Sequence, residues 1–210
     1  MKLRKQTNDI ENTTYEVKVM SKQAKTLNTE ELRRVLDYVA TRKHSLRNRA
    51  LVTCSFLSGM RVGELSSLTY ADVVDDEGKV RDEIRLKAEN TKTNEARTIF
   101  VSSKLKKELQ QYANAYKPTD KKLKFFYSQK RASDGFTANT LTQFFHYLYK
   151  RAGIVGASSH SGRRTMISTL AAKGISVRLL ASLAGHRNIS TTQAYIDVND
   201  DMKRKAVELV

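Results

Sequence analysis

The chain has 210 residues, of which 40% are hydrophobic and 29% are charged, and it contains one cysteine. This size and apolar content are enough for one large core, and a single cysteine excludes an internal disulfide and a zinc site built from several cysteines. The formal net charge of +16 indicates either a polyanionic partner, most often nucleic acid, or a charged ribosomal-type surface, and it does not distinguish DNA from RNA.

Neither a membrane segment nor a secretory signal is expected. The sequence contains no run of about 18 apolar residues, which is the length that a spanning helix needs. The first residues, MKLRKQTNDIENTT, contain no apolar core of the kind that a secretory signal has. We therefore expect a cytoplasmic protein. Cys54 lies in the apolar run ALVTCSFL and is expected to be a buried structural thiol.

The chain divides near residue 25. Residues 1–24 are polar and are predicted to be an N-terminal arm or linker, in which the alternation of Tyr15, Val17 and Val19 allows one short strand. Residues 25–210 are predicted to form a single domain that ends in a short tail helix.

The first helices have clear start and stop signals. Asn28 and Glu31 form a capping-box pattern, and the apolar residues that follow lie on one helical face. A second helix is predicted over residues 46–58, with Gly59 as its left-handed end. Arg61 then lies at the start of the next helical stretch, VGELSSL.

Residues 75–101 have the pattern of a small antiparallel sheet. A turn signal at Asp76, Glu77 and Gly78 precedes alternating Ile84 and Leu86, and a second β-rich run is TIFV. The polar segment ENTKTNEA between the runs is predicted to be a hairpin tip.

The rest of the chain is predicted to be helical, with apolar stripes at helical spacing. The stripes begin at Leu105, Leu141, Met166 and Val177. Gly185 ends the helix that starts at Val177, and His186 follows directly. Ser190 or Thr191 is expected to cap a last short helix that carries Tyr195.

Five side chains make up an inventory for phosphodiester chemistry. Tyr195 is a candidate nucleophile, although a tyrosine hydroxyl has an ordinary pKa near 10 and needs a base or nearby cations to attack at neutral pH. The candidate proton acceptor and its support are His160 and His186. Arg61 and Arg163 can offer forked donors to the phosphate oxygens. Each residue also has a plain structural interpretation: a surface ion pair for an arginine, a helix cap for a histidine and a packed ring for Tyr195.

The order of these residues resembles the tyrosine recombinases, also called the phage integrase family. SGMRVGELSSL is similar to the family's first arginine motif, and HSGRR to its His-x-x-Arg motif, with Gly162 and Arg164 in place of the more frequent Leu and His. LLASLAGHRNISTTQAYIDV is similar to the segment that runs through the second histidine to the tyrosine. The resemblance covers about residues 25–205. Four motif elements in the right order, namely the first arginine, His-x-x-Arg, the second histidine and the tyrosine, are far more specific than one.

The resemblance implies a mainly helical catalytic domain with a small antiparallel sheet. It also implies that Tyr195 attacks the scissile phosphate of double-stranded DNA and forms a 3′-phosphotyrosine, which a 5′-hydroxyl later reverses. Arg61 and Arg163 would then stabilise the transition state, with His160 as base or proton relay and His186 in support. The family's hairpin lysine, the general acid, corresponds to Lys92, with Lys87 as the second candidate. Neither metal, ATP nor another cofactor is implied.

The resemblance also leaves alternatives open. Family members usually carry a further DNA-binding domain before the catalytic one, and the 24 residues before the predicted domain leave either a fragment or a short, invertase-like member. We expect self-assembly as a dimer or tetramer on DNA, with accessory DNA-bending proteins as further partners. Two other functions fit the pattern: a type IB topoisomerase-like enzyme, and a non-catalytic DNA-binding regulator.

Overall fold

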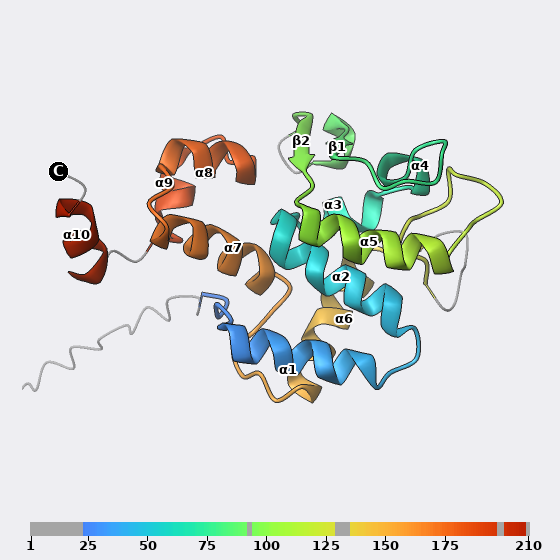
Figure 1. Cartoon of the computed structure of the whole chain (residues 1–210), viewed down its shortest axis with the longest axis horizontal. Helices are drawn as coiled ribbons and strands as arrows, with labels where there is room; N and C mark the ends of the chain where they lie inside the picture. The colour runs from blue at the N-terminus through green and yellow to red at the C-terminus, as the bar shows by residue number, and fades with distance from the viewer. Residues whose placement is uncertain (1–22, 92–93, 129–134, 197–199, 209–210) are drawn as a thin grey trace, which may run out of the picture.

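The computed structural model describes residues 23–91, 94–128, 135–196 and 200–208. They form a mainly helical domain with a two-stranded antiparallel sheet, which confirms the predicted fold class (Figure 1). The strands are β1 (Glu83–Leu86) and β2 (Arg97–Phe100), and the turn η1 (Ala88–Asn90) lies between them. The helices are α1 (Thr29–Ala40), α2 (Ser45–Ser58), α3 (Val62–Ser67), α4 (Tyr70–Val73), α5 (Ser103–Ala115), α6 (Ala138–Arg151), α7 (Ser161–Ala172), α8 (Val177–Ala184), α9 (Ile189–Gln193) and α10 (Asp200–Val207).

Helix α2 lies near the middle of the molecule and packs against α1, α5 and α7 (Figure 1). Leu51, Val52 and Cys54 are all buried, as expected for a helix that is covered on every side. Burial raises the pKa of the Cys54 thiol to about 12, which agrees with its predicted structural role. Gly59 ends the helix in the left-handed conformation with φ of 63°, as predicted.

Helix α7 approaches α2 closely because residue 162 has no side chain. A Cβ atom at Gly162 would lie 2.2 Å from the Ser55 hydroxyl oxygen and 2.9 Å from the Ser55 carbonyl carbon. This contact gives a packing reason for the glycine at the position where the resembling family more often has leucine. It also brings Arg163 beside the C-terminal end of α2.

The N-terminal helix and the hairpin follow the predicted patterns. In α1 the Asn28 side chain accepts a hydrogen bond from the Glu31 N–H, and the Glu31 carboxylate accepts one from the Asn28 N–H. In the sheet, Ile84 pairs with Ile99, and both side chains are buried. The segment before Lys92 is partly ordered as η1 rather than as a simple polar tip.

The C-terminal part has its own small apolar cluster. Its buried members lie on α7 and α8, and Tyr195 and Ile196 pack against them; the buried residues are Ile167, Ala171, Leu180 and Ala184. The start of the predicted last helix, at a cap of Ser190 or Thr191, was placed two or three residues too late. Asn188 caps α9 through its side chain, the helix ends at Gln193, and Tyr195 lies in the turn beyond it.

The predictions for the two ends of the chain have different outcomes. Helix α10 is present where a tail helix was predicted, and it lies apart from the other helices (Figure 1). The strand predicted around Tyr15, Val17 and Val19 lies outside the described residues. No helix in the described part of the chain is long and apolar enough to cross a lipid bilayer.

Candidate active site

Three distant segments meet at the C-terminal end of α8. Arg61 precedes α3, Arg163 lies in the first turn of α7, and His186 follows the glycine that ends α8. Gly185 adopts the left-handed conformation with φ of 62°, which turns the chain sharply before His186. The structure therefore brings Arg61, Arg163 and His186 together, although Arg61 and Arg163 are far apart in the sequence.

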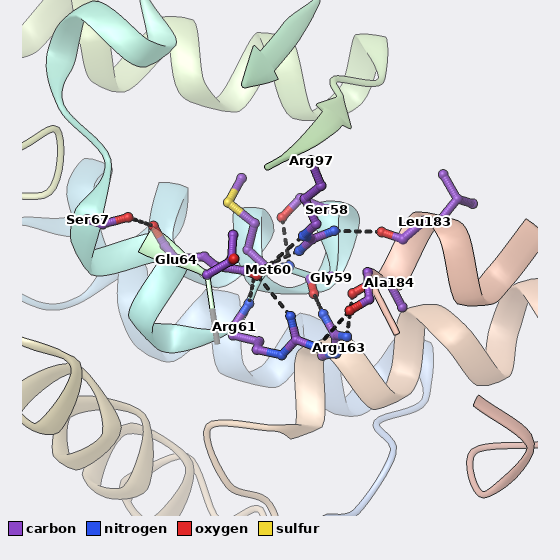
Figure 2. A network of polar contacts seen from close by, with 12 residues as sticks. Ser58, Gly59, Met60, Arg61, Glu64, Ser67, Arg97, Arg163, Leu183 and Ala184 are labelled. Atoms are coloured by element: carbon purple, nitrogen blue, oxygen red, sulfur yellow. Dashed lines mark hydrogen bonds and ion pairs between the residues drawn. The ribbon is translucent and has the colours of Figure 1, made fainter. Parts of the chain in front are cut away.

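The last carbonyls of α8 hold the arginines in place (Figure 2). Arg163 Nη2 donates to the Ala184 carbonyl at 2.6 Å, and Arg61 Nη2 donates to the Gly185 carbonyl at 3.1 Å. The final carbonyls of a helix have no partner within the helix, and they lie at the negative end of its dipole. The end of α8 is thus a natural acceptor for cationic side chains.

Arg163 is almost fully enclosed. Its side chain is 3% exposed and also donates to the Gly59 carbonyl at 2.7 Å and to His186 Nε2 at 2.8 Å. Burial, together with the charges of Arg61 and Arg97, lowers the pKa of Arg163 to about 10, so the guanidinium stays charged at neutral pH. Its hydrogen-bond acceptors are carbonyls and an imidazole rather than a carboxylate, which leaves the charge suited to an anionic ligand.

His186 is neutral, and its hydrogen bonds determine which ring nitrogen carries the proton. Because Nε2 faces an Arg163 donor, the proton is assigned to Nδ1, which lies 2.8 Å from the Thr192 hydroxyl oxygen. Burial and the charges of Arg163, Arg61 and Arg97 lower the pKa of His186 to about 4. The imidazole is therefore an acceptor toward Arg163 at neutral pH.

The ring of Tyr195 contacts both His186 and Arg164. It stacks on the His186 ring with centroids 5.7 Å apart, and the Arg164 guanidinium lies 5.6 Å from its centroid. The Ser168 hydroxyl donates to the Tyr195 carbonyl at 2.8 Å, which ties the turn to α7. Arg164, the second departure from the family motif, thus has a direct contact with the candidate nucleophile.

Tyr195 faces an open cleft of about 480 Å³. His160 and Arg164 line the same cleft, together with Gln23 and Ala24 from the start of the described chain. His160 stands at the N-cap of α7 and is exposed, whereas Arg163 is buried, so the two lie in different environments although they are only three residues apart. His160 lines the cleft, and Arg163 is directed toward the end of α8.

The structure describes one of the two lysines that are candidates for the general acid. Lys92 lies outside the described residues, so its assignment stays a prediction. Lys87 is exposed and stands directly after β1, at the base of the hairpin tip. Within the described ranges, His, Cys, Asp and Glu side chains form no group of three that could hold a metal ion.

The sequence patterns did not single out two residues of the site, Glu64 and Arg97. Glu64 is 1% exposed and binds both Arg61 Nη1 at 2.9 Å and Arg97 Nη2 at 2.6 Å. Burial by itself would raise the pKa of the Glu64 carboxyl, but the hydrogen bonds and charges of Arg97 and Arg61 hold it below its usual value. The sequence contains a signal for each of them. For Glu64 it is the Arg-x-x-Glu spacing at a helix start, and for Arg97 it is a position two residues before the buried Ile99, on the same face of the strand.

Acidification should destabilise the protein through His186. Its pKa is about 4 in the fold and about 6.5 in an unfolded chain, so between these values the unfolded state binds more protons. The contribution of the neutral His186 imidazole to the free energy of unfolding is full above about pH 6.5, and it is lost as the pH falls toward 4. Urea unfolding at about pH 7 and about pH 5 should show a smaller change in the free energy of unfolding for His186→Gln than for the wild type.

The matched control for this experiment is the exposed His146 on α6. His146→Gln shows how much of any change follows from the loss of one exposed imidazole. If His186→Gln keeps the wild-type dependence on pH, His186 is not a neutral, desolvated imidazole in the folded protein.

The chain is similar to a set of known DNA-processing proteins. The model of the phage integrase family matches residues 25–202. Tyrosine recombinase XerA of Pyrococcus furiosus is 26% identical over 184 residues, which are 88% of this chain and 61% of that protein. XerA of Saccharolobus solfataricus is 29% identical over 189 residues, 90% of this chain and 57% of that protein. The chain thus spans about three fifths of the length of these relatives.

Solved structures share the fold. A crystal structure of XerA recombinase has a TM-score of 0.69 at 24% identity and covers 88% of this chain and 64% of that one. The Tn1549 transposon integrase in complex with transposon right end DNA has a TM-score of 0.70 at 20% identity, covering 89% of this chain and 66% of that one. The catalytic domain of bacteriophage HP1 integrase has a TM-score of 0.57 at 21% identity and covers 82% of this chain and 87% of that domain.

Proposed function

The chain belongs to the phage integrase family, and on that premise we propose that it is a site-specific DNA recombinase that works through a 3′-phosphotyrosine on Tyr195. The observation that carries this proposal is the convergence of Arg61, Arg163 and His186 at the end of α8, with Tyr195 stacked on His186 beside an open cleft. Relatives named tyrosine recombinases, and a transposon integrase solved with DNA, support the choice of substrate.

In the proposed first step the Tyr195 hydroxyl oxygen attacks the scissile phosphorus. The bond from phosphorus to tyrosine forms, the bond to the 5′-oxygen breaks, and the leaving oxygen takes a proton that we assign to Lys92. His160, which lines the same cleft, is proposed to accept the tyrosine proton. One phosphate ester replaces another, so the energy of the bond is kept for the reverse attack by a 5′-hydroxyl.

The arginines would stabilise the charge that gathers on the phosphate. A guanidinium has five N–H groups, and Arg163 has three acceptors among the residues that the structure describes, which leaves donors for a non-bridging oxygen. Such fixed donors need no rearrangement when the negative charge develops. Each of them therefore lowers the barrier of the reaction substantially. His186, neutral and held by Thr192, is proposed to orient Arg163 and to contact the phosphate.

One assay separates recombination from the topoisomerase-like alternative. Supercoiled plasmids with and without the DNA that flanks the protein's own gene are incubated with the protein, and the products are resolved on gels. A recombinase gives rearranged products only with the flanking DNA. Relaxation of both plasmids to the same extent would support the topoisomerase-like alternative, and binding without either reaction would support a regulator.

DNA affinity should depend steeply on salt. With a formal net charge of +16, we expect contacts to about 6–10 phosphates, so affinity should fall by about 10³–10⁵ between about 50 and 200 mM salt. Fluorescence anisotropy with a labelled duplex, titrated at several salt concentrations, measures the slope. A flat response would contradict a binding mode based on phosphate contacts.

We also propose that α10 joins neighbouring protomers on DNA. The helix lies apart from the body of the molecule (Figure 1), and Val207 on it is 70% exposed, so this apolar side chain is available to a second copy. Deletion of residues 200–210 should abolish cooperative DNA binding in a gel-shift titration, and Val207→Asp should weaken it. Cooperativity that survives both changes would mean that α10 does not link protomers. Accessory DNA-bending proteins remain a further proposal.

A further inference from the structure

Arg97 on β2 connects the two halves of the site. Its Nη2 and Nε atoms donate to the two carboxylate oxygens of Glu64 at 2.6 and 3.3 Å, and its Nη1 donates to the Leu183 carbonyl at 2.7 Å. The Arg97 side chain is only 11% exposed. Figure 2 shows it lying between Glu64 and the end of α8. One guanidinium therefore fixes the distance between α3 and α8.

The end of α8 receives an arginine at each of three consecutive carbonyls. Leu183 accepts from Arg97, Ala184 accepts from Arg163, and Gly185 accepts from Arg61. Gly185 also leaves room for the first of them, because a Cβ atom there would lie 2.6 Å from Arg97 Cδ. The glycine thus serves both the turn before His186 and the approach of Arg97.

We propose that Arg97 is a positioning residue for the strand-cleavage step, acting on Arg61 through Glu64 and on His186 through the end of α8. This inference rests on the proposed function. The Arg97 contacts with Glu64 and Leu183 lie inside the protein, so its effect on DNA is indirect. Arg97 also follows Lys92 by five residues and begins β2, so the same side chain anchors the hairpin of the proposed general acid.

A lysine cannot replace this arginine. An ammonium is a single point charge, whereas the contacts to Glu64 and to Leu183 need the separated donors of a planar fork. Arg97→Lys keeps the charge and loses the bridge, so α3 and α8 are free to shift. A displacement of about 1 Å at the reacting groups is enough to slow a reaction by about 100-fold.

The first test compares Arg97→Lys with Arg85→Lys, a matched control on the exposed side of β1. Single-turnover cleavage of a duplex and the dissociation constant for DNA are measured for each, and circular dichroism checks the fold. We expect Arg97→Lys to cleave about 100-fold more slowly with DNA affinity within about threefold of the wild type, and Arg85→Lys to behave as the wild type. Cleavage at the wild-type rate, or an equal loss of affinity and cleavage, would overturn the proposal.

The second test follows the His186 imidazole by NMR. The groups that face it are Arg163, Thr192 and Tyr195, and the charges of Arg61, Arg97 and Glu64 also act on it. In Arg97→Met one of these cations is removed from beside the end of α8, so the pKa of His186 should rise. An unchanged His186 titration would overturn the link to the end of α8.

These two tests separate failure of this inference from failure of the proposed function. If the wild-type protein forms no covalent adduct with any DNA, the proposed function fails, and the NMR titration still reports on Arg97. If Arg97→Met does not fold because the buried Glu64 loses its ion pair with residue 97, the Arg97→Lys comparison decides alone.

Discussion

Tyr195→Phe should abolish strand cleavage and leave DNA binding nearly unchanged. The substitution removes only the hydroxyl, while the ring keeps its stack on His186 and its contact with Arg164. The hydrogen bond from Ser168 goes to the backbone of residue 195 and is also kept. Loss of an enzyme's nucleophile costs on the order of 10⁶ in rate, so cleavage should fall below detection in a single-turnover gel assay.

Tyr147→Phe is the matched control, because Tyr147 is exposed on α6 and lies outside the cleft. It should cleave DNA at the wild-type rate. A Tyr195→Phe protein that still cleaves would move the nucleophile to another residue, and one that no longer binds DNA would show that the hydroxyl has a structural role.

Arg163→Lys should slow cleavage by about 10³ even though it keeps the positive charge. A guanidinium reaches the Gly59 and Ala184 carbonyls and His186 at once, and a lysine ammonium cannot hold all three positions and also offer a fork to a phosphate. Removal of one fixed donor from a developing oxyanion costs about 10²–10³, and the loss of the His186 contact adds to it.

The control for this change is Arg178→Lys on the exposed face of α8. Single-turnover rates and DNA dissociation constants are compared for both variants. A cleavage rate within tenfold of the wild type in Arg163→Lys would mean that a point charge suffices at this position, and the forked contact to phosphate would have to be given up.

Local signals predicted the elements of the fold well. The Asn28–Glu31 capping box and the glycines that end α2 and α8 are short-range features, and each is present in the structure. The prediction that Tyr195 lies within the last short helix was wrong, because two residues compete to be the N-cap of that helix. Asn188 was a better N-cap than Ser190, so α9 starts and ends earlier and the tyrosine lies beyond it.

Long-range partners could not be predicted from the sequence. Arg163 bonds to a carbonyl 104 residues away, and Arg97 joins Glu64, 33 residues away, to the end of α8. Backbone carbonyls have no residue-type signature, so only the fold shows which of them accept. The motif order marked Arg61, Arg163, His186 and Tyr195 as candidates; it gave no hint that the end of α8 gathers the arginines.

The most direct test of the central claim is covalent trapping on a nicked duplex that contains the DNA flanking the protein's own gene. The nick lets the short 5′-hydroxyl strand diffuse away after cleavage, so a 3′-phosphotyrosine accumulates. We predict a protein–DNA adduct on a denaturing gel in the presence of EDTA, with the nucleotide on the peptide that contains Tyr195 and no adduct in Tyr195→Phe. An adduct mapped to another residue, or DNA bound tightly but never trapped on any flanking sequence, would contradict the account.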